Sequence, residues 1–141
     1  MDLERALRFS HYAGRLLAAQ PGLRDELVAT LGAPFDMARA LAALEPHVDA
    51  VDGHALDAAL RRLRRRVMLH TLARDLTGAL TRAEVFDAMT LLAEGAIDAV
   101  LRLHHRDLAA TFGEPRGAAD GAPQAMNVVA LGKLGGGELN V

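Results

Sequence analysis

The chain has 141 residues, a formal charge of −2, 51% hydrophobic but only 4% aromatic residues, and no cysteine. The nearly neutral charge argues against a nucleic-acid partner, and the lack of cysteine excludes disulfides and thiolate metal sites. There is neither an N-terminal export signal nor an apolar run of the ~20 residues that span a bilayer, so we expect a cytoplasmic protein without a membrane partner.

The first half of the chain is predicted to form short helices, because alanine and leucine dominate it and valine and isoleucine are sparse. Pro21-Gly22 and Gly32-Ala-Pro34 break the pattern, while Asp2 and Asp36 are suitable N-caps. The expected segments are helices over residues 2–19, 23–31 and 37–44, followed by a connector over residues 46–53.

Two longer helices are predicted in the second half. Asp52 can cap a helix that runs to about Thr77 and that Gly78 ends. Its leucines change face near Val67, so this helix should bend or change packing partners there. Thr81-Arg-Ala-Glu84 has the spacing of a capping box. It predicts a helix of roughly thirty residues, which Gly113 ends.

The most informative segment is residues 126–141. Residues 126–131 form a mainly apolar run that contains two valines, which is typical of a short strand buried on both faces. Residues 132–137 contain four glycines, and Glu138-Leu-Asn140 is expected to begin a helix. A glycine-rich turn between a strand and a helix lets backbone N–H groups approach phosphate oxygens.

Two common phosphate-binding motifs do not fit this turn. A Walker A loop requires a glycine and a Ser or Thr where the chain has Asn127 and Leu134. A dinucleotide-binding fingerprint requires a third glycine in phase, where the chain has Asn140. From the glycines alone, a tight structural corner is as good an interpretation as a phosphate cradle.

Two segments carry a family resemblance. Gly132-Lys-Leu-Gly-Gly-Gly-Glu-Leu-Asn140 resembles the Gly-Lys-Leu-Gly-Gly-x-Glu-Leu-Asn segment of the bacterial glutamine synthetase adenylyltransferase/adenylyl-removing enzymes, a family of polymerase-β-type nucleotidyltransferases. Residues 60–69, which are rich in arginine, resemble a helical stretch upstream of that motif, and residues 10–21 resemble the start of the family. Glu138-Leu-Asn140 is more similar to the N-terminal half of these enzymes, the half that removes AMP, than to the half that adds it.

The resemblance implies a mainly α fold with the first strand and glycine-rich turn of a truncated nucleotidyltransferase domain. It implies a helical region over residues 1–115, a loop over residues 116–124, and the start of that domain over residues 125–141. Gly135 and Gly136 would contact nucleotide phosphates. Lys133 is a further candidate, with a solvent-facing turn lysine as its alternative. The arginine that the family often has at position 137 is a glycine here, so its phosphate contact cannot be carried over.

In the intact enzyme, the resemblance implies that phosphate removes AMP from a tyrosine of glutamine synthetase and releases ADP, while the other half adds AMP. Mg²⁺ and an adenine nucleotide would be the cofactors of the intact enzyme, and we expect neither to be bound to this chain alone. Glutamine synthetase and a PII-type signal protein would be the partners, with glutamine as a candidate effector. The metal-binding Asp-x-Asp pair would follow Val141, so we assign no catalytic or metal-binding residue and expect this chain alone to be inactive.

The alternative function is a non-enzymatic helical protein-interaction domain in which the glycines only form a corner. The arginine run over residues 61–66 fits a solvated helix face, with ion pairs to Asp57 or to glutamates elsewhere, better than it fits a phosphate site. The histidines lack the spacing of a metal site.

Overall fold

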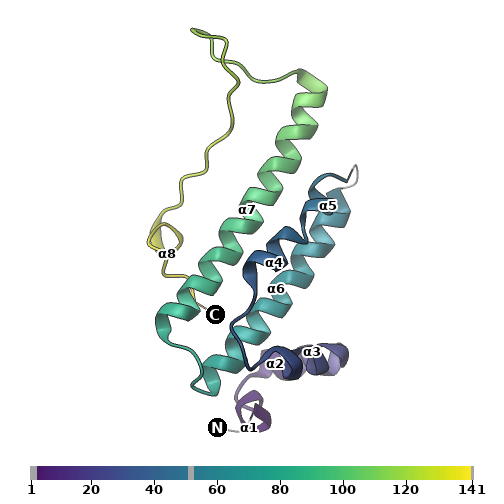
Figure 1. Ribbon diagram of the computed structural model, residues 1–141, viewed down its shortest axis with the longest axis vertical. Helices are drawn as coiled ribbons and strands as arrows, with labels where there is room; N and C mark the ends of the chain where they lie inside the picture. The colour runs from purple at the N-terminus through teal and green to yellow at the C-terminus, as the bar shows by residue number, and fades with distance from the viewer. Residues whose placement is uncertain (1–2, 51–52, 141) are drawn as a thin grey trace.

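The computed structural model describes residues 3–50 and 53–140, and their fold is mainly helical, as expected (Figure 1). These residues contain no β-strand, and only an isolated antiparallel bridge joins Arg116 to Pro123. None of the described helices combines the length and the apolar character that a membrane crossing requires. The helices are α1 (Leu3–Leu7), α2 (His11–Ala19), α3 (Gly22–Thr30), α4 (Met37–Ala42), α5 (Glu45–Val48), α6 (Gly53–Leu76), α7 (Arg82–Phe112) and α8 (Gly132–Gly135).

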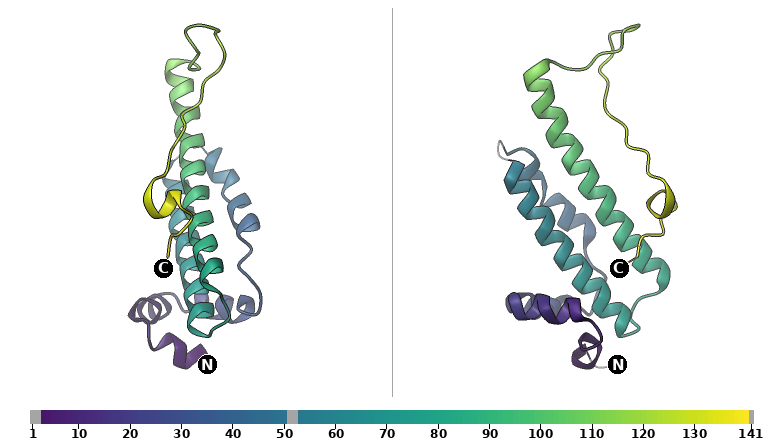
Figure 2. Two further views of the ribbon diagram at one scale, coloured as in Figure 1. Left: turned by 90° about the vertical axis from the view of Figure 1, so that its left-hand side faces the viewer. Right: turned by 180° about the vertical axis from the view of Figure 1, so that it is seen from behind.

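The long helices α6 and α7 form an antiparallel hairpin, and α4 and α5 lie along it (Figures 1 and 2). Helices α1 to α3 lie at the end of the hairpin where α6 meets α7. After α7 the chain turns and runs back alongside that helix, so that the end of this segment lies next to the N-terminal half of α7. The fold is therefore a small helical bundle with an extended terminal segment on one side.

Helix α6 contributes to two separate cores. Leu56, Leu63 and Val67 belong to a core shared with α4, α5 and α7, whereas Leu69 and Ala73 belong to a core shared with α1, α2 and α3. Burying a side chain of this size stabilises a fold by about 1.5–3 kcal/mol, so each core gives its helices a reason to pack on α6. The predicted change of packing partners near Val67 is confirmed.

The predicted end signals of the long helices are confirmed. The Thr81 hydroxyl accepts a hydrogen bond from the N–H of Glu84 at 3.3 Å, and the Glu84 carboxylate accepts one from the N–H of Thr81 at 2.7 Å. Gly78 and Gly113 end α6 and α7 with φ angles of 74° and 88°, which favour glycine. Asp36 caps α4 by accepting a hydrogen bond from the N–H of Arg39 at 3.0 Å.

The first half of the chain departs from the predicted helices in two places. The first helix does not run without a break to Ala19, because the Ser10 hydroxyl accepts a hydrogen bond from the N–H of Ala13 and starts α2 as a new helix. The expected connector over residues 46–53 contains most of α5, because Pro46 fits a first helical turn, where its missing N–H has no partner to lose. The predicted caps Asp2 and Asp52 lie outside the described residues.

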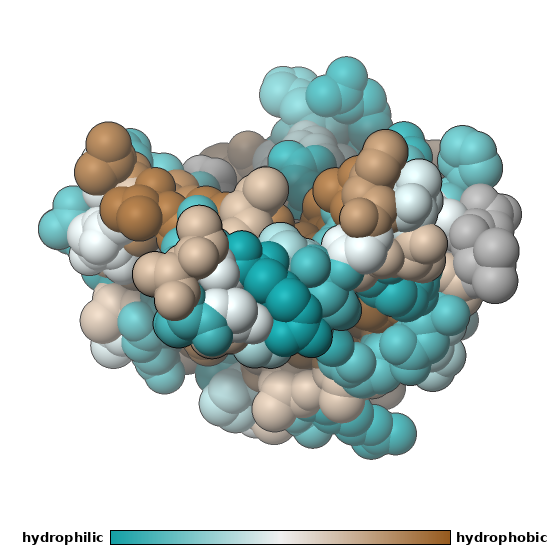
Figure 3. Space-filling model, turned by 90° about the horizontal axis from the view of Figure 1, so that it is seen from above, coloured by the Kyte–Doolittle hydropathy of each residue, from teal (hydrophilic) through white to brown (hydrophobic). Residues whose placement is uncertain are grey.

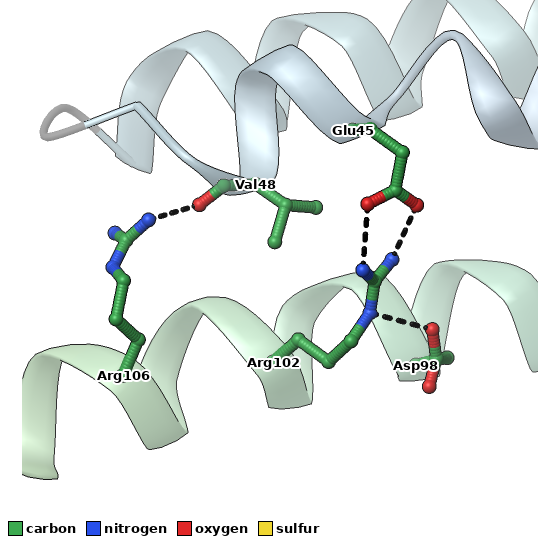
Figure 4. A network of polar contacts seen from close by, with 5 residues as sticks. All are labelled: Glu45, Val48, Asp98, Arg102 and Arg106. Carbon is green, nitrogen blue, oxygen red and sulfur yellow. Dashed lines mark hydrogen bonds and ion pairs between the residues drawn. The ribbon is translucent and has the colours of Figure 1, made fainter.

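Polar contacts fix α5 on α7 (Figure 4). The Arg102 guanidinium donates two hydrogen bonds to the Glu45 carboxylate, at 2.7 and 2.8 Å, and a third to Asp98 at 2.8 Å. Arg106 donates to the Val48 carbonyl at the end of α5, and to the Ala50 carbonyl at 3.0 Å. The bond from Arg102 lowers the pKa of Glu45 below its ordinary value. The ion pairs of Arg102 are exposed to water, so they fix orientation more than they add stability.

Helix α4 approaches α7 closely at Gly95. A Cβ atom at this position would lie only 2.4 Å from Cδ2 of Leu41, so no larger residue fits without a shift of that leucine. Small residues allow two helix surfaces to interlock at short distance. Gly95 therefore sets the position of α4 on the hairpin.

Candidate functional site

Residues 126–131 are extended but do not form the predicted strand. Met126, Val129 and Leu131 expose 69%, 81% and 84% of their surface, so the expected burial on both faces is also wrong for the described structure. A strand needs a neighbour that pairs with its N–H and C=O groups, and the described part of the chain offers none at this place. The apolar pattern indicates that residues 126–131 could pair with a neighbouring strand, but it does not indicate whether such a strand is present.

The glycine-rich turn itself is compact. Gly132 and Gly137 have φ angles of 63° and 68°, a backbone conformation that favours glycine, and α8 occupies the residues between Leu131 and Gly136. A Cβ at Gly135 would lie 2.4 Å from the Ala130 carbonyl oxygen, so the chain requires a glycine there. The helix that we predicted to begin at Glu138 is absent, because the helical turn forms earlier, over Gly132–Gly135.

The three predicted phosphate-binding residues lie together in this turn because they are neighbours in sequence. Lys133 lies within α8 and is exposed, Gly135 ends the helix, and Gly136 follows it. The N–H of Gly136 donates to the Gly132 carbonyl at 2.9 Å, whereas that of Gly135 has only a long contact of 3.5 Å to the Leu131 carbonyl. The Gly135 N–H is thus the easier of the two to redirect toward a ligand. Phosphate binding by these residues stays a prediction.

The arginine run does not join the glycine-rich turn. Helix α6 and helix α8 lie on opposite sides of α7 (Figures 1 and 2). Arg61 donates a hydrogen bond to Asp57 at 2.8 Å, and Arg66 pairs with Glu26 of α3. The predicted role as a helix face with ion pairs is confirmed for these two arginines.

A buried polar cluster, which we did not predict, joins α3 to α6. His70 is only 3% exposed, and its Nε2 lies 3.2 Å from the Thr30 carbonyl oxygen. The buried Arg74 guanidinium donates to the Leu31 carbonyl at 2.6 Å and to the Ala79 carbonyl at 3.2 Å. Both side chains thereby satisfy carbonyl groups at the end of α3, which a helix leaves without partners. Their spacing of four residues was the one available signal.

Desolvation lowers the pKa of His70 below its ordinary value of 6.5. The carbonyl groups of Thr30 and Ala33 and the charge of Glu26 act against this effect, whereas the charge of Arg74 adds to it. Phe35 packs against the imidazole, with its ring centroid at 5.4 Å, and also lies under the Arg66 guanidinium. The cluster keeps His70 neutral near pH 7, which suits a structural hydrogen bond.

An apolar hollow of about 420 Å³ lies between the C-terminal half of α7 and the returning chain. Leu108, Phe112 and Met126 line it, together with His104 and His105. Viewed from this end of the molecule, hydrophobic side chains are open at the surface (Figure 3). The hollow contains no acidic side chain and lies away from the glycine-rich turn.

The residues around the turn do not form a site for a divalent cation. Over residues 3–50 and 53–140, no group of three or more His, Asp or Glu side chains could hold a metal ion. Glu138 is the one carboxylate within the sequence from 126 to 141, and the chain contains no Asp-x-Asp pair. Magnesium needs several oxygen ligands, usually from carboxylates, phosphates and water.

The comparison with known proteins covers the whole chain. The chain is 42% identical over 138 residues to the bifunctional glutamine synthetase adenylyltransferase/adenylyl-removing enzyme of Nitrosomonas europaea. This match covers 96% of the chain and 15% of that enzyme. The enzymes of the same name from Burkholderia mallei and Chromobacterium violaceum are 43% and 40% identical, over 96% and 99% of this chain and 15% of each enzyme.

The chain therefore spans about 15% of the length of these relatives. No solved structure matches it. The family model described as glutamate-ammonia ligase adenylyltransferase matches residues 1–141, which is the full sequence. Together with the relatives above 30% identity, this match shows that the chain belongs to the glutamate-ammonia ligase adenylyltransferase family.

Proposed function

We propose that this chain supplies the helical N-terminal region, and the first part of the nucleotidyltransferase domain, of an enzyme that controls glutamine synthetase by removing and adding AMP on a tyrosine. The observation that carries the proposal is the family match over residues 1–141, which includes both the arginine-rich helix and the glycine-rich turn. The bifunctional names of the relatives support it. Glutamine synthetase and a PII-type signal protein are the proposed partners.

The similarity of Glu138-Leu-Asn140 to the N-terminal half favours AMP removal as the reaction to which this region contributes. In that reaction an oxygen of inorganic phosphate attacks the phosphorus of the tyrosine-bound AMP. The bond between this phosphorus and the tyrosine oxygen breaks, ADP is released, and the phenolate takes up a proton. Most of the catalytic effect in such displacements comes from positioning and from stabilising negative charge.

Within this chain, the backbone N–H of Gly135 and Gly136 would donate to phosphate oxygens, and Lys133 would add a positive charge. Because the Gly136 N–H already donates to Gly132, a ligand must displace that internal bond, whereas Gly135 offers the weaker contact. Glycines on both sides of the turn make such a rearrangement possible without steric strain. We expect phosphate oxygens to approach Gly135 first.

The residues present do not fit the family's Mg²⁺, because no carboxylate pair accompanies the turn. We therefore assign no step to the metal within this chain. Incubated with adenylylated glutamine synthetase, phosphate and Mg²⁺, the 141-residue chain should release no ADP. Release above the level of a protein-free control would contradict this assignment.

A chimera tests the function directly. Residues 1–141 replace the matched region of the Nitrosomonas europaea enzyme, with which they share 42% identity. We expect the chimera to release ADP from adenylylated glutamine synthetase, and we expect Gly135→Ala to abolish this release, since its Cβ would collide with the Ala130 carbonyl. The AMP-adding reaction of the same chimera serves as the internal control for folding. A chimera that adds AMP but cannot remove it would sink the proposal.

The second candidate function is a helical protein-interaction domain with a structural glycine corner. The internal hydrogen bonds of the turn favour it, because Gly136, Gly137 and Glu138 each donate to a carbonyl within the turn. Titrating the ¹⁵N-labelled chain with ADP separates the two functions. Shifts confined to residues 132–137 support the phosphate site, whereas binding of glutamine synthetase without any ADP response supports the interaction domain.

A further inference from the structure

We propose that Leu139 is a positioning residue that anchors the glycine-rich turn to the core of the helical bundle. The inference rests on the proposed function, because it gives the turn a defined place relative to the helices. It concerns how the phosphate-binding segment is held, and it assigns Leu139 no contact with a ligand.

The returning chain is loosely attached before Leu139. Residues 118–129 are exposed throughout, and the apolar side chains of Val129 and Leu131 are open to water. Among the described residues from 113 to 140, Leu139 is the one that packs against the core of α4 to α7. The end of this segment lies beside the N-terminal half of α7 in every view (Figures 1 and 2). Leu139 thus supplies the hydrophobic contact that the rest of the segment lacks.

The turn next to Leu139 is held together by its own hydrogen bonds. The Glu138 N–H donates to the Lys133 carbonyl at 2.7 Å, and the Gly137 N–H donates to the Leu134 carbonyl at 3.1 Å. Residues 132–138 therefore move as one unit, and fixing the residue that follows them fixes the unit. Leu139 is half-buried where it packs against the core, and close packing holds a side chain within a narrow range of positions.

The bundle can influence the turn through this contact. The core against which Leu139 packs includes Met37 and Leu44 from the region of α4, Val67 of α6, and Met89 of α7. A shift among these helices changes the surface against which Leu139 packs, and this displaces Lys133, Gly135 and Gly136 together. In a phosphate site, an error of about 1 Å can cost two orders of magnitude in rate.

Backbone relaxation of the ¹⁵N-labelled 141-residue chain tests the anchor. We expect order parameters above about 0.8 for residues 133–138, and values below about 0.6 in Leu139→Ala. Leu131→Ala removes the same atoms from an exposed position and should change nothing, and Leu139→Ile should restore order. Order parameters that stay high in Leu139→Ala overturn the inference. The values for α6 and α7 show whether the variant still folds.

The chimera described above supplies the second readout. Leu139→Ala should lower the kcat of ADP release at least tenfold while AMP addition stays unchanged, and Leu139→Ile should recover most of it. Loss of order in the turn without a change in ADP release overturns the positioning role. If the chimera with Leu139 intact removes no AMP, the proposed function fails, and the relaxation measurement still decides the anchor.

Discussion

The helical bundle and the terminal segment both contain apolar side chains, but the bundle buries them whereas the terminal segment leaves most of them exposed. Leu63 of α6 is 4% exposed within the core, whereas Leu131, which precedes the glycine-rich turn, is 84% exposed. Each helix of the hairpin satisfies its own backbone hydrogen bonds and needs a partner only for its apolar face. An extended segment needs a partner for its backbone as well.

The interactions that stabilise the fold and the residues predicted to bind phosphate therefore lie in separate parts of the chain. The bundle has its cores, its capping box and its buried polar cluster, and none of these contains a predicted site residue. The terminal segment contains all three predicted site residues and is attached to the core by Leu139. Such segments are suited to binding, since they can move without loss of the fold.

A matched pair of leucine substitutions should give the largest contrast. Leu63→Ala leaves a cavity in the core and should lower the free energy of unfolding by about 2–5 kcal/mol. Leu131→Ala removes the same atoms from a side chain exposed to water and should change the free energy of unfolding by less than about 0.5 kcal/mol. Urea denaturation followed by far-UV circular dichroism measures both. Equal losses in the two variants would mean that Leu131 is covered in solution.

Two glycine substitutions sharpen the comparison. Gly95→Ala places a Cβ 2.4 Å from Leu41 and should destabilise the bundle by about 1–3 kcal/mol. Gly135→Ala makes an equally short contact, with the Ala130 carbonyl, but it should disturb only the turn and leave the global unfolding midpoint unchanged. The double variant Leu41→Ala/Gly95→Ala is the control. It should be less destabilised than the sum of its single changes, and strict additivity would show that the two residues do not touch.

The capping box should have a smaller effect. Thr81→Ala removes the hydroxyl that accepts the Glu84 N–H and should cost about 1 kcal/mol of unfolding free energy. Thr81→Ser keeps that hydroxyl and should stay close to the wild type. The segment around α8 has no side-chain cap at Leu131, so nothing comparable can be lost there. A Thr81→Ser variant as unstable as Thr81→Ala would assign the effect to packing of the methyl group.

Signals that act within a few residues predicted the helices well. The Thr81 and Glu84 spacing, Asp36, Gly78 and Gly113 each set a helix end by a local hydrogen bond or a backbone angle, and all of them do so in the structure. The change of face near Val67 also located the boundary between the two cores. The break before α2 was predictable from the sequence, because Ser10 is of a residue type that commonly caps a helix N-terminus.

Features that depend on distant segments were not predictable in the same way. Residues 126–131 have the composition of a strand, but pairing requires a neighbour that composition does not reveal. The anchoring of Leu139 and the bonds of Arg74 join residues far apart in the chain. For the site, the sequence placed Lys133, Gly135 and Gly136 in one tight turn, but it did not show that the turn's own carbonyl groups already accept the Gly136 N–H.

The buried histidine gives the smallest predicted effect, and it belongs to the joint between α3 and α6. Because burial holds the pKa of His70 below 6.5, the unfolded chain takes up a proton at a higher pH than the folded protein does. The stabilising effect of neutral His70 is therefore fully present above pH 6.5 and is lost as the pH falls from 6.5 through the lowered pKa. At pH 6 this loss is at most about 0.8 kcal/mol.

Urea denaturation at pH 7.5, 6.5 and 6.0 measures this loss of stability, with His70→Gln, which does not titrate, as the control. The wild type should lose more stability over this range than His70→Gln, and parallel losses would show that His70 accepts its proton as readily when folded as when unfolded.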